Sequence, residues 1–193
     1  MTPQDILAQF GPREAMEYDV VIVGGGPAGL AAAIHLKQIA AQTSADVSVV
    51  VIEKGSEPGA HILSGAVMDP RAMNELFPNW QSLGAPLDQP VTADELLVLS
   101  ANGHTATPSW LMPRNFHNDG CYVVSLSNVV KWLAQQAEAL GVDIFPGFTA
   151  AEVLYNEHGA VIGVATGHVG LGKDGQPTDH FQLGMEQIGR AHV

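Results

Sequence analysis

A glycine-rich turn between an apolar strand and an alanine-rich helix constrains the fold of this chain more than any other feature. Residues 20–23 (VVIV) form an uninterrupted β-branched run, which is typical of a parallel strand buried on both faces. Gly24, Gly26 and Gly29 then satisfy the pattern G-x-G-x-x-G, and the spacing predicts a helix from Pro27 to about Ile39. Together they predict a strand, a tight turn and a helix in direct succession.

Each glycine of the pattern has a separate steric role. Gly24 permits the tight turn after the strand, and Gly26 lets a pyrophosphate approach the backbone. Gly29 allows the helix to pack closely on the strand. The free N–H groups and the positive end of the helix dipole point at the turn, where they favour an anion. This arrangement predicts a dinucleotide-binding site.

A second strand supports this interpretation. Residues 47–52 (VSVVVI) are apolar, and they end in Glu53, about twenty residues after Gly29. An acidic side chain at this place accepts a hydrogen bond from a ribose hydroxyl in dinucleotide-binding folds. The alternative, a solvated strand end, is less favoured because the upstream elements fit the pattern.

The rest of the chain predicts an α/β fold with antiparallel excursions. Residues 54–70 have the composition of a loop, and a hairpin follows with its turn at Asn102–Gly103. Ser127 is the expected N-cap of a helix that ends at Gly141.

After this helix we expect a strand at residues 142–145. A hairpin of residues 152–155 and 161–166 and a loop at residues 168–179 are expected to follow. Residues 71–90 are expected to hold a short helical turn anchored by Leu76, Phe77 and Trp80.

Composition excludes several classes of function. The 193 residues carry a formal net charge of −12, so no basic face is available for nucleic acid. Cys121 is the only cysteine, which excludes an internal disulfide and a cysteine-held metal cluster in this chain, and we expect it to be buried. No targeting segment and no apolar stretch of about twenty residues is visible, so a bacterial cytoplasmic origin is expected.

Three segments together resemble a known family. They are GAHILSGAVMDP (59–70), the block GCYVVSLSNVVKWLAQQAEALGVDIFPGFTAAEVLY (120–155) and GVATGHVGLGKDGQP (163–177). They resemble the N-terminal part of electron transfer flavoprotein-ubiquinone oxidoreductases, and the likeness runs from about Asp19 to Glu186. The glycine turn is shared with many flavoproteins, whereas these segments are more particular.

The resemblance implies a Rossmann-like FAD-binding domain of the glutathione-reductase type, incomplete at its C-terminus. It also implies a separate part with a [4Fe–4S] cluster, and electron transfer from reduced electron transfer flavoprotein to ubiquinone. Peripheral association with the cytoplasmic face of a bacterial inner membrane follows from the same likeness. Two alternatives stay open: a related flavin enzyme such as a geranylgeranyl reductase or aromatic monooxygenase, and a dinucleotide-binding module without redox activity.

The resemblance also implies the residues that contact FAD. The glycine turn would receive the pyrophosphate, Glu53 the adenosine ribose, and the loop 59–65 the ribityl chain and flavin, while residues 149–152 would pass the adenine. The implied set is Gly24, Gly25, Gly26, Pro27, Ala28, Gly29, Glu53, Lys54, Gly59, His61, Ile62, Ser64, Gly65 and Ala150. No protein residue is identified as an acid or base, and His61 is expected to be a hydrogen-bonding spacer rather than a proton carrier.

Residues 108–116 (PSWLMPRNF) are unusually apolar for a loop. A membrane or quinone contact is one interpretation. Core packing beneath the hairpin is the favoured one, because exposed apolar side chains acquire meaning only as a contiguous patch.

The last residues do not fit the family. Residues 188–193 (IGRAHV) can be encoded by the start of a widely used sequencing-library adapter, so we expect them to be non-native. The expected division is therefore an N-terminal tail (1–17), an FAD-binding part with the start of a quinone-binding region (18–187) and a non-native tail (188–193). Any other codon set in the underlying DNA would overturn the adapter interpretation.

Overall fold

A computed structural model describes residues 3–62, 65–173 and 175–192. The chain divides into two compact units: residues 1–61 with 133–193, and residues 62–132. The first unit contains the glycine-rich turn, and the second contains the β-hairpin and the apolar loop.

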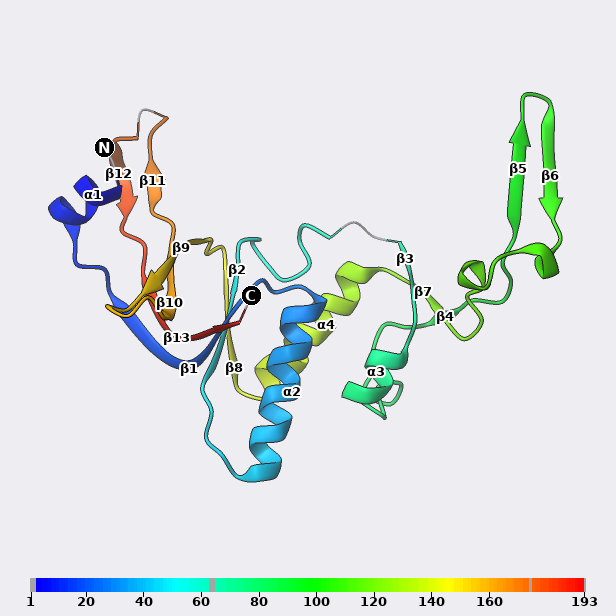
Figure 1. Cartoon of the computed structure of the whole chain (residues 1–193), viewed down its shortest axis with the longest axis horizontal. Coiled ribbons are helices and arrows are strands. Elements are labelled where there is room, and N and C mark those ends of the chain that lie inside the picture. Colours follow the sequence, from blue (N-terminus) through cyan, green and yellow to red (C-terminus); the bar gives the residue numbers. More distant parts are fainter. Residues whose placement is uncertain (1–2, 63–64, 174, 193) are drawn as a thin grey trace. The chain divides into compact units, whose positions relative to one another are not determined.

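A mixed sheet forms the centre of the first unit (Figure 1). Its strand order is β8-β2-β1-β13-β10-β9. The neighbours β8, β2, β1 and β13 pair in parallel, whereas β10 pairs antiparallel with both β13 and β9. The strands are β1 (Ala15–Val23), β2 (Val49–Glu53), β8 (Val142–Pro146), β9 (Ala150–Tyr155), β10 (Val161–Thr166) and β13 (Glu186–His192). This confirms the predicted parallel sheet with an antiparallel excursion.

Both faces of the central strand β2 are buried, as its apolar run predicts. Residues 49–52 of β2 are at most 1% exposed. Helix α2 (Pro27–Thr43) packs against β1, β2 and β8, and it ends at Ser44, which adopts the left-handed conformation. Elsewhere in this sheet, Val21, Val50, Ile52 and Val164 form one buried cluster.

The N-terminal segment is structured. Residues 3–10 form α1 (Pro3–Phe10), and β1 begins at Ala15, so part of the expected tail lies in regular elements. At the other end, residues 188–192 lie in β13, where Gly189 sits so close to Tyr18 that a Cβ would come within 2.4 Å of the Tyr18 carbonyl oxygen. The adapter origin of this segment stays a prediction about its codons.

The second unit contains a small sheet of order β3-β7-β4 and a separate hairpin. Its elements are β3 (Ala66–Met68), α3 (Arg71–Leu76), β4 (Gln89–Pro90), β5 (Leu96–Ser100), β6 (Gly103–Thr107), the short 3₁₀ turns η1 (Ser109–Leu111) and η2 (Arg114–Phe116), and β7 (Tyr122–Val124). Trp80 is buried as expected, and its Nε1–H donates to Asn74 Oδ1 at 2.8 Å. Helix α4 (Leu126–Ala139) crosses the division between the units.

Several local predictions were wrong. The hairpin turn is Ala101–Asn102, because Gly103 already pairs with Ser100. Helix α4 begins at Leu126, so Ser127 lies inside the helix and is not its N-cap.

The predicted loops also contain strands. Residues 66–68 form β3, which pairs with β7, and the predicted loop 168–179 contains β11 (Val169–Leu171) and the start of β12 (Pro177–Gln182). Cys121, expected to be buried, is half-buried.

Candidate functional site

The turns that follow three parallel strands meet at one edge of the sheet. Strands β1, β2 and β8 are neighbours and run in the same direction, so their carboxyl ends lie together. Gly24 follows β1, Lys54 follows β2, and Gly147 follows β8. Ligands of open α/β sheets bind outside the carboxyl ends of the strands, so this edge is the candidate binding site.

The glycine-rich turn has the geometry that its sequence predicts. Gly24 has φ +106°, a left-handed conformation that other residues rarely adopt. A Cβ on Gly29 would lie 2.1 Å from the Gly24 carbonyl oxygen, so only glycine permits this close packing of α2. In contrast, a Cβ on Gly26 would meet no heavy atom within 4 Å. The turn therefore leaves open space beside Gly26 at the beginning of α2, where Pro27 is the first helical residue and Ala28 the second.

Glu53 joins the ends of two turns. Its Oε2 accepts a hydrogen bond of 2.8 Å from the Gly25 backbone N–H, and its Oε1 accepts one of 2.6 Å from the Gly55 backbone N–H. Each carboxylate oxygen has a second lone pair, so both can still accept a hydroxyl hydrogen. Glu53 is only half-buried, and it can therefore hold the glycine turn and bind a sugar at the same time.

A pocket of about 200 Å³ opens at this edge. Its lining residues are Val23, Gly24, Ile52, Glu53, Lys54, Phe148, Thr149 and Ala150. The structure thus brings together four of the predicted residues from three separate parts of the sequence: Gly24, Glu53, Lys54 and Ala150. Phe148 was not predicted, although its position just after a strand that ends at the same edge could have indicated it.

Three features of this edge match the parts of a dinucleotide. The space beside Gly26 is open, a carboxylate lies next to the pocket, and the N-terminus of the 17-residue α2 points at the turn. A phosphate at the helix and a sugar at Glu53 are both accommodated. The residues present fit such a group.

The remaining predicted residues divide between the units. Gly59 and the exposed His61 belong to the first unit, while Ile62 and Gly65 belong to the second. Gly65 has φ +95°, which explains a glycine there. Ser64 lies outside the described residues.

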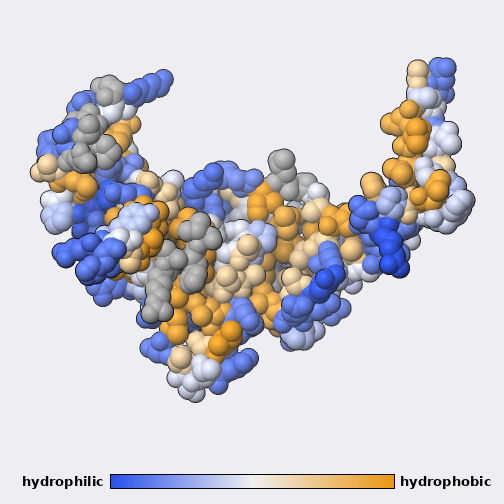
Figure 2. All heavy atoms as spheres, in the orientation of Figure 1, coloured by the Kyte–Doolittle hydropathy of each residue, from blue (hydrophilic) through white to orange (hydrophobic). Residues whose placement is uncertain are grey.

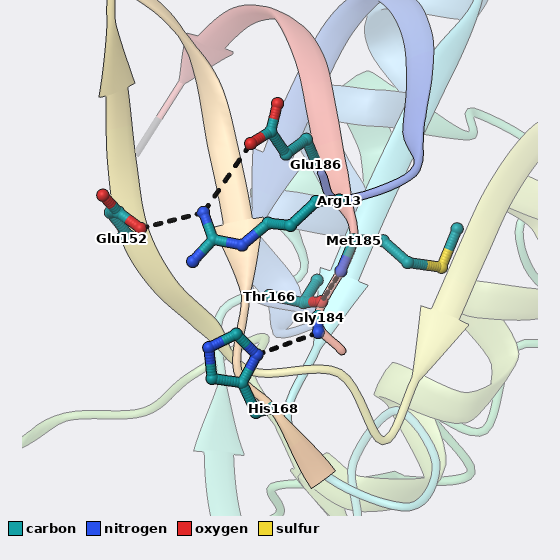
Figure 3. Close-up of polar contacts among 7 residues, drawn as sticks. All are labelled: Arg13, Glu152, Thr166, His168, Gly184, Met185 and Glu186. Atoms are coloured by element: carbon teal, nitrogen blue, oxygen red, sulfur yellow. Dashed lines mark hydrogen bonds and ion pairs between the residues drawn. The ribbon is translucent and has the colours of Figure 1, made fainter. Parts of the chain in front are cut away.

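A polar cluster on β9, β10 and β13 was not predicted (Figure 3). The Arg13 side chain is only 5% exposed, and its Nη1 lies 2.9 Å from Glu152 Oε2 and 3.7 Å from Glu186 Oε1. In the sheet register Ala165 stands between these two glutamates, and its small side chain leaves room for the guanidinium group. The cluster fixes the segment before β1 to the sheet.

His168 completes this cluster. Its Nδ1 accepts a hydrogen bond of 3.0 Å from the Gly184 backbone N–H, while Thr166 Oγ1 accepts one of 2.8 Å from the Met185 N–H (Figure 3). Burial lowers the pKa of His168 from its ordinary value, and the nearby Arg13 cation lowers it further. The neutral ring is therefore the form that this environment favours.

Comparisons with known proteins agree with the geometry of the site. A family model described as an NAD(P)-binding Rossmann-like domain matches residues 22–81, which include the glycine turn and Glu53. A probable electron transfer flavoprotein-ubiquinone oxidoreductase from Acinetobacter baylyi is 59% identical over 90% of this chain. The corresponding oxidoreductase from Pseudomonas aeruginosa is 57% identical over 90% of this chain.

The chain is a homologue of the electron transfer flavoprotein-ubiquinone oxidoreductases. The resemblance predicted from the sequence motifs is thereby confirmed. The chain spans about a third of the length of these relatives, 31% and 32% respectively.

Solved structures share the fold with this chain. A geranylgeranyl bacteriochlorophyll reductase-like protein from Thermoplasma acidophilum has a TM-score of 0.57 at 19% identity, covering 91% of this chain and 38% of its own. The flavin-dependent monooxygenase PieE, solved with FAD and substrate, has a TM-score of 0.59 at 15% identity, covering 90% and 29%. The Rossmann-like fold class is confirmed, and the reductase or monooxygenase alternative is not favoured.

Proposed function

We propose that this chain is the FAD-binding part of an electron-transferring-flavoprotein dehydrogenase, which passes electrons from reduced electron transfer flavoprotein to ubiquinone. The observation that carries the proposal is the pocket beside Glu53 and the glycine turn, in a chain 59% identical to a relative of that name. FAD supplies the electron-transfer chemistry, because a flavin accepts and releases electrons one or two at a time. The chain binds and orients it.

The residues at the carboxyl edge have distinct roles in this proposal. Backbone N–H groups at the start of α2 hold the pyrophosphate, and the open space beside Gly26 admits it. Glu53 accepts a hydrogen bond from a ribose hydroxyl while it holds the turn at Gly25. Lys54 and Ala150 line the pocket for the adenosine end.

The loop that follows is assigned to the other end of FAD. Gly59, His61, Ile62, Ser64 and Gly65 are proposed to approach the ribityl chain and the flavin, on the strength of the family likeness. His61 is proposed as a hydrogen-bonding spacer in this loop.

A peripheral membrane location is proposed from the second unit. The segment expected to pack in a core instead carries Trp110 at 81% and Leu111 at 60% exposure, which corrects the favoured interpretation from the sequence. Hydrophobic residues also gather on the hairpin β5–β6 (Figure 2). The exposed large apolar side chains of this region are Leu97, Val98, Leu99, Trp110, Leu111 and Phe116. Exposed apolar side chains gathered in one region suit a membrane surface or a quinone tail.

The proposed location is the cytoplasmic face of a bacterial inner membrane. The two bacterial relatives are 59% and 57% identical to this chain, whereas the mitochondrial relatives from rat and mouse are 51% identical. Among the described residues no helix is long and apolar enough to cross a membrane. The proposal assigns the membrane contact to the exposed apolar side chains of the second unit.

The [4Fe–4S] cluster is assigned to the remainder of the protein. Such a cluster takes four thiolates, and this sequence has one cysteine. The proposal therefore requires a closely spaced group of cysteines in the gene beyond the Gln187 codon. On its own, the chain is not expected to reduce quinone.

Three measurements test the proposed function. Titration of the purified chain with FAD, followed by flavin fluorescence, is expected to show saturable binding. Sequencing of the gene past the Gln187 codon is expected to find the cysteine group, and the purified product of the complete gene should show flavin absorbance with a broad iron–sulfur shoulder. Absence of the cysteine group would move the assignment to a flavin reductase or monooxygenase, and absence of FAD binding in the complete protein would end the flavoprotein assignment.

A further inference from the structure

Backbone hydrogen bonds hold Phe148 at the pocket. The Gly147 N–H donates to the Gly55 carbonyl oxygen at 2.7 Å, and the Phe148 N–H donates to the Glu53 carbonyl oxygen at 3.0 Å. The next residue is held as well, since the Thr149 carbonyl oxygen accepts a hydrogen bond of 2.9 Å from the Gly167 N–H. Three consecutive residues are thus tied by their backbones to neighbouring elements.

The turn that presents Phe148 depends on its glycine. Gly147 has φ +83°, a conformation that other residues rarely adopt, and it connects the end of β8 directly to Phe148 at the carboxyl edge. A residue with a fixed backbone presents its ring at little further cost in conformational entropy.

Phe148 is partly exposed and lines the pocket together with several apolar residues. Phe148 retains 38% exposure, although its ring packs at 6.1 Å from the ring of Phe145. Val23, Ile52 and Ala150 line the same pocket, and Ile52 belongs to the buried cluster of the sheet. A flat apolar group can therefore lie between an aromatic ring and an aliphatic wall.

The pocket also has polar residues, and Glu53 is the one that carries a carboxylate. Glu53 is a hydrogen-bond acceptor with free lone pairs beside this apolar space. A flat base attached to a sugar places its ring on the apolar side and its hydroxyls on the carboxylate. A purine stacks on an aromatic ring more strongly than a pyrimidine does, because its ring system is larger.

We infer that Phe148 is the base-stacking residue of the pocket and makes it selective for a purine nucleotide. The inference deepens the proposed function and rests on it, because the purine is the adenine of FAD. ADP is the probe, since it contains the base, the ribose and the pyrophosphate without the flavin.

Calorimetric titration of this chain with ADP tests the role of Phe148. Phe148→Ala is expected to weaken ADP binding about 10-fold or more, and Phe148→Tyr to bind within about 3-fold of the parent chain. Phe148→Leu keeps apolar bulk without a ring, and it is expected to behave more like Phe148→Ala. Tyr155→Ala is the matched control, because Tyr155 is an exposed aromatic residue on β9 that does not line the pocket.

Comparison with CDP tests the selectivity itself. The parent chain is expected to prefer ADP over CDP, and Phe148→Ala to reduce that preference. Circular dichroism and the melting temperature of each variant show whether it has folded; if Phe148→Ala does not fold, Phe148→Leu against Phe148→Tyr gives the same comparison.

The outcomes separate this inference from the proposed function. If the parent chain binds FAD and ADP but the folded Phe148→Ala or Phe148→Leu variant binds ADP equally well, the inference is wrong and the proposed function stands. If the parent chain binds neither ligand, the inference fails, and FAD binding by the product of the complete gene decides the proposed function. An unchanged preference for ADP over CDP in the ring-free variants would also overturn the assigned selectivity.

Discussion

The carboxylate of Glu53 accepts a hydrogen bond of 2.8 Å from the backbone N–H of Gly25. A Cβ on Gly25 would lie 3.2 Å from both the Cβ and the Oε2 of Glu53, closer than ordinary van der Waals contact, so this approach favours a glycine. The second oxygen accepts the N–H of Gly55, and one side chain therefore connects the two turns that border the pocket.

Replacement of Glu53 should weaken FAD binding by two routes. Glu53→Ala removes the acceptor for the ribose hydroxyl and releases the two turns, so we expect a loss on the order of 1.5–3 kcal/mol in binding free energy. Glu53→Gln should also bind FAD more weakly, because a neutral amide is a poorer acceptor and its NH₂ group cannot accept the backbone N–H groups. Titration with FAD measures both, with Glu157→Gln in the exposed β9–β10 turn as the control. Unchanged affinity of Glu53→Ala would remove Glu53 from the site.

Two glycines of one motif should respond differently to substitution. Gly26→Val places its side chain in open space, so the protein should fold but lose FAD, because the side chain occupies the room needed by the pyrophosphate. Gly29→Ala forces a Cβ against the Gly24 carbonyl oxygen, so it should destabilise folding by about 1–3 kcal/mol. Urea denaturation and FAD titration of both variants check this contrast. A folded Gly26→Val protein that binds FAD normally would contradict the assignment.

Gln187 is buried without a partner for its side-chain oxygen. It is 1% exposed, it stands next to the buried Val164 in the sheet register, and its Oε1 has no hydrogen-bond donor in the described part of the chain. Gln187→Leu should therefore raise the stability of this chain by about 1–3 kcal/mol, since an unsatisfied buried acceptor is removed. Thermal unfolding measures this, and Gln135→Leu, at an exposed helical position, is the control. A lower melting temperature for Gln187→Leu would contradict the prediction and indicate that the Gln187 amide stabilises the fold.

His168 should make the stability of the first unit sensitive to acid. Burial and Arg13 lower its pKa in the folded protein, so below the ordinary value of about 6.5 the unfolded chain binds a proton more readily than the folded one. The stabilising contribution is present above that pH and is lost as the pH falls toward the folded pKa. His168→Asn keeps an acceptor for the Gly184 N–H but does not titrate. Melting temperatures between pH 5 and 8 should fall less on acidification in His168→Asn than in the parent or in the His158→Asn control; equal falls would contradict the assignment.

Trp110 offers a direct signal for the proposed membrane contact. It is 81% exposed, whereas Trp80 and Trp132 are 3% and 7% exposed, so a change of tryptophan emission on adding vesicles should report Trp110. We expect a blue shift with phospholipid vesicles and a several-fold weaker partition for Leu111→Ser, because less apolar surface leaves water. Tyr155→Ser, in the first unit, should partition like the parent chain. No shift with any vesicle composition would argue against membrane contact by this region.

The sequence predicted the parallel core because its signals are local. The β-branched run at residues 20–23 favours a strand, and the structure has one there. Gly24 adopts a positive φ and Gly29 allows close helix packing, as the motif predicts. The hairpin at 169–182 was missed because its two strands are separated by several turn-forming residues, and only their pairing shows that they are strands. Pairing of distant segments leaves little trace in composition.

The site was predicted in the same uneven way. Glu53 follows from its position after a buried strand, whereas Phe148 depends on the neighbouring place of β8 in the sheet, which the sequence does not state. Arg13 was overlooked because its partners, Glu152 and Glu186, are far away in the chain. Likewise, no local pattern separates an apolar loop that is covered from one that is exposed, as Trp110 shows.

The place of β13 between β1 and β10 has a consequence for how the protein is made. A ribosome completes β1, β2, β8 and the β9–β10 hairpin before it adds β13. Until then, the described strands on the β1 side and the β9–β10 hairpin have no ladder of hydrogen bonds between them, because β13 is the strand that joins them. Closure of the sheet is thus a late event between segments distant in sequence, such as Ala15 and Glu186. The nascent chain would expose two open strand edges during this interval, which is when chaperones and the speed of translation have most influence on its fate.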